Sequence, residues 1–194
     1  MRCKLKFTTT KESCVKIPGY QVVEELYSNT KTYVCRAIKL ETQDYVVLKY
    51  LNREYPTQNE ITKVQYEYDI IKSLNLSGIV KVLSYEKANN SAMIVMEDSK
   101  ARSLKQMMDE EPIKIEVALD YFIRFCEILS EVHNKGVIHR DIKPHNIIVL
   151  PNDETNSQKI QLIDFGIAVN YFENILGADE AIPLNILGAD EAIP

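Results

Sequence analysis

The chain has 194 residues, of which 45% are hydrophobic and 26% charged, so it is long enough to bury a sizeable core. Its net charge of −5, without a long basic run, argues against nucleic acid or an anionic membrane as its partner. No stretch has the length of a membrane span, and the cysteines form neither a C-x-x-C pair nor a disulfide pattern, so we expect a cytoplasmic location.

The first half of the chain reads mainly as short strands. Residues 1–16 lack periodicity and are interpreted as a flexible leader. Apolar runs at residues 21–27, 32–38 and 45–50, separated by turn-like segments, predict an antiparallel meander. The first turn contains no glycine, and we expect Asn29 to adopt a left-handed backbone there, with hydroxyls supplied by Ser28, Thr30 and Thr32.

Helical patterns alternate with further strands downstream. A helix is predicted from Thr57, because Thr57 and Glu60 have the spacing of a capping box. Strands over 80–85 and 92–96 and a short helix over 103–108 follow it. A long amphipathic helix is predicted over 116–135, with one apolar face made of Ala118, Phe122, Phe125, Cys126, Leu129 and Val132.

A polar loop between apolar strands, His139–Asn146, carries the strongest chemical signal, together with the triplet Asp164-Phe165-Gly166. Asp141 could accept a proton from a hydroxyl group, and Lys143 could reach a phosphate. Asn146 and Asp164 offer the hard oxygen ligands that Mg²⁺ prefers. The alternative is that these residues only shape a turn and cap a helix. That alternative would be favoured for any one residue alone, but not for the ordered set.

His139-Arg140-Asp141-Ile142-Lys143-Pro144-His145-Asn146 and the Asp164-Phe165-Gly166 triplet resemble the catalytic loop and metal-binding motif of the eukaryotic-type serine/threonine protein kinases. The resemblance implies an α+β, bilobal protein-kinase-like fold. Residues 17–98 would form a complete β-rich small lobe with one helix, and residues 99–170 part of a helical large lobe. Residues 171–194 hold a duplicated acidic segment, which we expect to be poorly ordered.

The resemblance also implies ATP and Mg²⁺ as cofactors and particular roles for individual residues. Asp141, Lys143 and Asn146 would be catalytic, and Asn146 and Asp164 would bind the metal. Lys49 would contact the phosphates while paired with Glu67, and His139 would brace the loop rather than act as the base. The remaining nucleotide contacts would come from Asn29, Thr30, Val34, Met96 and the backbone of Glu97 and Ser99.

Lys143 in the catalytic loop implies serine or threonine, in a protein substrate, as the phosphate acceptor. The segments at 17–20 and 33–37 further resemble the kinase module that opens large bacterial hybrid serine/threonine–histidine kinases, so ATPase or sensor domains of a longer parent chain are expected partners. The chain contains no A-P-E motif, and we expect it to be C-terminally truncated and marginally stable. A nucleotide-binding pseudokinase or an inactive fragment acting as a regulatory module stays open as an alternative. A small-molecule kinase is disfavoured by the compact loop.

Overall fold

The computed structural model describes residues 16–53, 55–88, 91–151 and 160–171. Residues 1–15 of the predicted leader and 172–194 of the predicted tail lie outside these ranges, as do the hairpin tip at 89–90 and most of the polar excursion after residue 151. None of the helices in the described part of the chain is long and apolar enough to cross a membrane.

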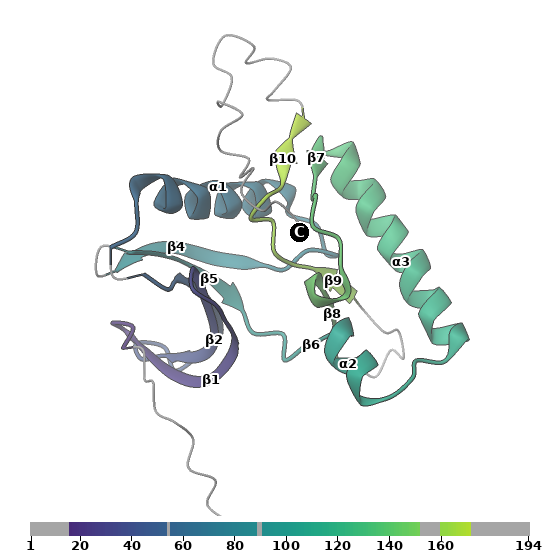
Figure 1. Ribbon diagram of the computed structural model, residues 1–194, viewed down its shortest axis with the longest axis horizontal. Coiled ribbons are helices and arrows are strands. Elements are labelled where there is room, and N and C mark those ends of the chain that lie inside the picture. Colours follow the sequence, from purple (N-terminus) through teal and green to yellow (C-terminus); the bar gives the residue numbers. More distant parts are fainter. Residues whose placement is uncertain (1–15, 54, 89–90, 152–159, 172–194) are drawn as a thin grey trace, which may run out of the picture.

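A five-stranded antiparallel sheet dominates the first part of the chain, which corresponds to the small lobe (Figure 1). Its strands follow the order β1-β2-β3-β5-β4 and have the bounds β1 Tyr20–Ser28, β2 Thr32–Lys39, β3 Tyr45–Leu51, β4 Val82–Ala88 and β5 Ser91–Glu97. The predicted three-stranded meander, now β1 to β3, is therefore confirmed, with strand ends that differ by at most one residue.

The alternation of side chains along the strands places Lys49 and its neighbours on one face of the sheet, which we call the functional face. Cys35 and Ala37 of β2 and Val46 and Leu48 of β3 are buried together in one hydrophobic cluster. Because successive strand residues point to opposite faces, Lys49 must lie on the other face. The register pairs Val34 with Lys49 and Arg36 with Val47, so all four residues share that functional face.

Helix α1 (Gln58–Leu74) packs against β4 and β5. It begins as predicted, since the Thr57 hydroxyl accepts a hydrogen bond from the Glu60 amide and the Glu60 side chain reaches back to the Thr57 amide. Asn75 ends the helix in the left-handed region at φ 44°. The buried face of the helix includes Glu67, a charged residue that requires a partner.

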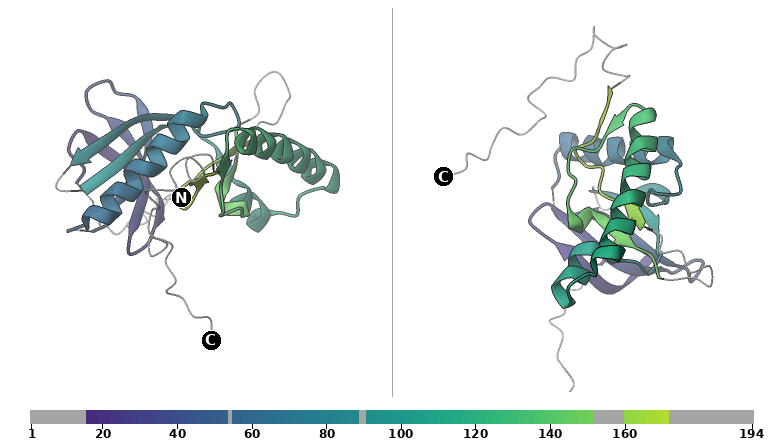
Figure 2. Two further views of the ribbon diagram at one scale, coloured as in Figure 1. Left: turned by 90° about the horizontal axis from the view of Figure 1, so that it is seen from above. Right: turned by 90° about the vertical axis from the view of Figure 1, so that its right-hand side faces the viewer.

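The second part of the chain consists of small strands and two helices, set beside the sheet (Figure 2). One sheet has the order β6-β8-β9 and another pairs β10 with β7. The elements are β6 Arg102–Ser103, α2 Leu104–Glu110, α3 Ile115–Asn134, β7 Val137–Ile138, the 3₁₀ turn η1 Pro144–Asn146, β8 Ile147–Val149, β9 Ile160–Leu162 and β10 Val169–Asn170.

The two parts are joined by backbone contacts as well as by the linker after β5. The Leu162 amide donates to the Gly78 carbonyl at 2.8 Å, and the Val80 amide donates to the Leu162 carbonyl at 3.2 Å. A side chain at Gly78 would meet Ile128 of α3, whose Cγ1 would lie 2.3 Å from the added Cβ. Glycine is therefore required where the α1–β4 connection crosses α3.

The apolar face predicted for α3 is partly wrong. The helix buries Tyr121, Ile128 and Val132, whereas Phe122 is 62% exposed and Cys126 is also exposed. Helical spacing alone identifies a hydrophobic stripe, but α3 is apolar around more of its circumference than its contacts in the described chain cover. Those contacts select the side centred on Tyr121, Ile128 and Val132.

Candidate active site

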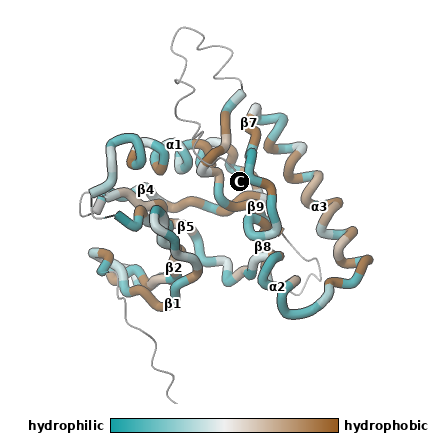
Figure 3. Tube along the Cα trace, in the orientation of Figure 1, coloured by the Kyte–Doolittle hydropathy of each residue, from teal (hydrophilic) through white to brown (hydrophobic). Residues whose placement is uncertain are grey.

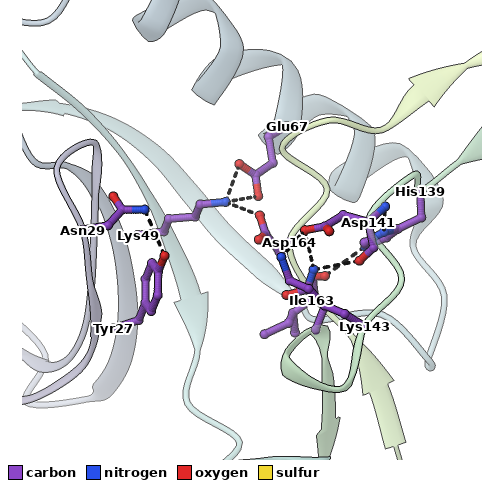
Figure 4. Close-up of polar contacts among 10 residues, drawn as sticks. Tyr27, Asn29, Lys49, Glu67, His139, Asp141, Lys143, Ile163 and Asp164 are labelled. Carbon is purple, nitrogen blue, oxygen red and sulfur yellow. Dashed lines mark hydrogen bonds and ion pairs between the residues drawn. The ribbon is translucent and has the colours of Figure 1, made fainter. Parts of the chain in front are cut away.

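A three-residue charge cluster lies on the functional face of the sheet (Figure 4). The Lys49 Nζ donates to both carboxylate oxygens of Glu67, at 2.7 and 2.8 Å, and to Asp164 Oδ1 at 2.7 Å. Strand β3, helix α1 and the segment after β9 thus each supply one member. The predicted Lys49–Glu67 pair is present, whereas the additional contact to Asp164 was not predicted.

Burial makes this cluster electrostatically strong. The side chain of Glu67 is 5% exposed and that of Lys49 is 18% exposed. Burial alone would lower the pKa of Lys49, but the two neighbouring carboxylates raise it well above its usual range. Burial likewise opposes ionisation of Asp164, yet the Lys49 ammonium holds the pKa of that carboxyl below its usual value. Lys49 is therefore a fixed cation at neutral pH.

A second polar cluster is built by the catalytic-loop residues between β7 and β8. The Lys143 Nζ donates to Asp141 Oδ2 at 2.6 Å, and Asn146 Nδ2 donates to the same oxygen and to the Asp141 carbonyl, both at 2.9 Å. Asn146 is buried, which fixes its amide group. Hydrogen bonding to Asp141 raises the pKa of Lys143. The loop thus holds Asp141 from two sides.

His139 holds this loop in place through hydrogen bonds, as predicted. It is 1% exposed; its Nε2 lies 3.0 Å from the Ile163 carbonyl, and its Nδ1 accepts from the Asp141 amide at 3.2 Å. Its ring packs edge-on against Phe165, with 4.6 Å between ring centroids. Burial lowers the pKa of His139, which keeps the imidazole neutral with its proton on Nε2. His139 thereby ties the Asp141 loop to the segment before Asp164.

Strained backbone occurs at both motifs. Arg140 has φ 69° and Asp164 has φ 67°, values that non-glycine residues adopt infrequently. Such conformations persist where surrounding contacts enforce them, as the His139 and Lys49 contacts do here. The backbone at Asp164, and at Arg140 next to Asp141, is therefore set by tertiary contacts rather than by local conformational preference.

The turn between β1 and β2 differs from the prediction. Asn29 is absent from the residues with positive φ, so the expected left-handed backbone is wrong. Instead, Asn29 Oδ1 accepts from the amides of Lys31 and Thr32, at 2.8 and 2.7 Å, and its Nδ2 donates to the Tyr27 hydroxyl. Asparagine stabilises the glycine-free turn through its side chain, as in an Asx turn. Thr30 lies exposed in the same turn.

The remaining predicted nucleotide contacts line the sheet and the linker. Val34 is half-buried on the Lys49 face of β2, and Met96 is 8% exposed near the end of β5. The Glu97 amide donates to the Lys81 carbonyl at 3.0 Å, so only the Glu97 carbonyl, not its amide, could face an adenine edge. Ser99 is half-buried in the linker that follows. Val34 and Met96, which pair with Lys49 and Val47 of β3, thus lie on the Lys49 face of the sheet.

The donor set suits Mg²⁺ held jointly with phosphates. No group of three or more His, Cys, Asp or Glu in the described residues is arranged to hold a metal by itself. Asn146 donates to Asp141 through Nδ2, so its amide oxygen is the atom that could bind a metal, and only one Asp164 oxygen binds Lys49. Mg²⁺ commonly takes one or two protein oxygens and completes its shell with phosphate and water. The residues present therefore fit the ion.

Sequence reasoning missed one buried polar group next to the cleft. Asp98 lies between Glu97 and Ser99, and its side chain is 2% exposed because it pairs with Arg36 Nε at 2.7 Å. An acidic residue within a linker reads as solvated from sequence. Only its distant partner, 62 residues away, shows that it is not.

Comparison with known proteins identifies the family of the chain. Residues 20–176 match the model of the protein kinase domain. The chain is 29% identical over 157 residues to MAP3K epsilon protein kinase 1 of Arabidopsis thaliana, and the aligned stretch covers 79% of this chain and 11% of that protein. It is 30% identical over 151 residues to a protein of Clostridium acetobutylicum named as a probable serine/threonine-protein kinase, covering 77% of this chain and 22% of that protein. A protein of Dictyostelium discoideum with the same kind of name is 28% identical over 159 residues, covering 81% of this chain and 31% of that protein. The chain thus spans a third or less of the length of these relatives, and it belongs to the protein kinase domain family.

Proposed function

We propose that this domain transfers the γ-phosphoryl group of ATP to serine or threonine hydroxyls of proteins in the presence of Mg²⁺. The observation that carries the proposal is the pair of clusters in one cleft: Lys49 with Glu67 and Asp164, and Asp141 with Lys143 and Asn146. Several relatives are named as serine/threonine kinases, which supports the acceptor class.

Each residue has a task that follows from its surroundings. The buried Lys49 cation is held in place by Glu67 to contact the α- and β-phosphates. Asn146 and Asp164 would hold Mg²⁺, which would neutralise phosphate charge. Asp141 orients the acceptor hydroxyl and takes its proton, and Lys143 stabilises negative charge on the transferring phosphoryl group.

Asp141→Asn provides the test. The purified chain, and a longer parent chain if one exists, is incubated with γ-labelled ATP, Mg²⁺ and a protein substrate, followed by phosphoamino-acid analysis. We expect phosphoserine or phosphothreonine from the wild type, no transfer by Asp141→Asn, and nearly unchanged Mg-ATP binding, because Asp141 faces the hydroxyl. Asp109→Asn, an exposed position on α2, is the matched control.

Two outcomes would contradict the proposal. Phosphotyrosine as the main product would reject the acceptor class implied by Lys143. Mg-ATP binding by every form of the protein without any transfer would instead favour the nucleotide-binding pseudokinase, in which the same cleft acts as a regulatory module.

A further inference from the structure

Arg36 on β2 joins two acidic side chains from different parts of the chain. Its Nε donates to Asp98 Oδ2 at 2.7 Å, and its Nη1 pairs with Glu24 on β1. The exposed fractions of the side chains are 20% for Arg36 and 2% for Asp98. A largely buried ion pair therefore ties the β1–β2 hairpin to the linker between β5 and β6.

The same aspartate also sets the course of the linker backbone. Its second oxygen, Oδ1, accepts from the Lys100 amide at 2.9 Å, and Lys100 adopts φ 53°. On the other side, the Glu97 amide donates to the Lys81 carbonyl. The start of the linker is consequently held through the backbone by Lys81, just before β4, and through Asp98 by β2.

This bridge lies on the functional face of the sheet, beyond the charge cluster. Arg36 is two residues from Val34 on β2, and their partners on β3 are Val47 and Lys49. Strand alternation places Val34 and Arg36 on one face. A cavity of about 640 Å³ lies beside the bridge, and its wall includes Glu24, Leu26, Arg36, Asp98 and Lys100.

We propose that the Arg36–Asp98 bridge is a positioning device for the adenine end of the nucleotide. It fixes the distance between β2, which covers the base, and the linker, whose Glu97 carbonyl and Ser99 backbone face the base edge. The inference rests on the proposed ATP-binding function. Without the bridge, the linker must be ordered when the base binds, and that ordering weakens binding.

The position of the bridge predicts a specific pattern of affinities. Arg36→Gln and Asp98→Asn should weaken Mg-ATP and adenosine by the same factor, about three- to ten-fold, since both ligands share the base. Lys49→Met should weaken Mg-ATP strongly and leave adenosine unchanged, since adenosine has no phosphates. Asp98→Asn keeps an oxygen for the Lys100 amide and places an NH₂ group against Arg36, so it removes the ion pair with little change in shape.

Isothermal titration of the purified full chain with Mg-ATP and with adenosine tests this pattern. The double variant should bind no more weakly than either single variant, because both remove the same interaction. Arg36→Lys, which retains a charge, should recover part of the affinity. Arg124→Gln is the matched control: it removes another arginine–aspartate pair, to Asp120 on the exposed side of α3, and should leave both affinities unchanged.

The possible failures are distinguishable. Wild-type chain that binds neither ligand overturns both the proposed function and this inference. Normal wild-type binding with unchanged affinities in folded Arg36→Gln and Asp98→Asn overturns the inference alone. So does a loss confined to Mg-ATP, since it would place the effect at the phosphates. If Asp98→Asn fails to fold by circular dichroism, Arg36→Gln and Arg36→Lys decide the question. In an active form of the protein, the same variants should raise KM for ATP and leave kcat unchanged.

Discussion

Strand β5 and helix α3 are both apolar, but they use their apolar residues differently. Every residue of β5 from Ser91 to Met96 is buried, between two hydrophobic clusters on opposite faces of the sheet. Helix α3 buries one side and leaves four large apolar side chains more than half exposed, and Figure 3 shows the mixed hydropathy along it. These side chains are Ile115, Leu119, Phe122 and Ile123.

An apolar groove beside these side chains sharpens the contrast. It has a volume of about 390 Å³ and lies between α2 and α3, with Leu104, Met108 and Phe125 in its lining. Tyr121 also lines it, and the Tyr121 hydroxyl is buried without a hydrogen-bond partner in the described part of the chain. Lys49 and Glu67 therefore lie beside a fully buried core, whereas the helix that supports the Asp141 loop has exposed apolar surface.

The largest expected effect is at the charge cluster. Lys49→Met strands Glu67 in a buried position and should lower the free energy of unfolding by roughly 3–5 kcal/mol near pH 7. The loss should shrink at pH 5, because burial already raises the pKa of Glu67 and the stranded carboxyl can then bind a proton. Urea denaturation at the two pH values measures both quantities.

The same variant should respond differently to nucleotide. Mg-ATP at a concentration that saturates the wild type should raise its melting temperature by mass action, and should raise that of Lys49→Met much less. Asp164→Asn is expected to reduce the response as well, because it weakens the metal site. A wild-type midpoint that does not move would argue against a nucleotide site on the sheet.

Two isoleucines on one helix test the contrast between covered and uncovered surface. Ile128 is 8% exposed and Ile123 is 58% exposed, so identical substitutions differ only in burial. Ile128→Ala should cost about 2–5 kcal/mol, whereas Ile123→Ala should stay within about 0.5 kcal/mol of the wild type. Equal losses in urea denaturation would mean that Ile123 is covered in solution and that the contrast is wrong.

The smallest expected effect concerns His139 and pH. Burial lowers its pKa in the folded protein, so below about pH 6.5 the unfolded chain binds a proton that the folded chain does not. Stability is therefore complete above the unfolded pKa and should fall as the pH drops below it, with a slope of at most about 1.4 kcal/mol per pH unit. Denaturation of His139→Gln between pH 5 and 8 should show a shallower slope, and exposed His145→Gln serves as the control.

Local patterns predicted most of the elements because those elements satisfy local rules. Short apolar runs between turn-like segments predicted the strands of the meander, and the Thr57–Glu60 capping box predicted the start of α1. The two-residue strands β6 and β10 are too short to produce a pattern, and their pairing depends on partners far along the chain. Asn29 was assigned a left-handed backbone because asparagine tolerates it, but its side chain offers a second way to close a turn.

The residues of the candidate site could be predicted from local motifs, but its long-range contacts could not. Lys49, Asp141, Asn146 and Asp164 occur within recognisable motifs, so sequence identifies them. The Lys49–Asp164 contact and the Arg36–Asp98 bridge each join segments more than 60 residues apart. The apolar face of α3 was misplaced for the same reason, since neighbouring elements rather than spacing select the buried side. Sequence periodicity carries no information about such long-range packing.

Hydrogen exchange of the purified chain, with and without saturating Mg-ATP, tests most directly whether a nucleotide site stands on the closed core of the sheet. Amides of residues 45–50 and 92–96 should be better protected than those of residues 118–132, since local stability follows buried contacts. Mg-ATP should add protection to residues 45–50 and to the linker at 97–100 in the wild type, and much less at the same concentration in Lys49→Met. Equal, strong protection of α3 and the sheet, or exchange that Mg-ATP leaves unchanged, would contradict the account.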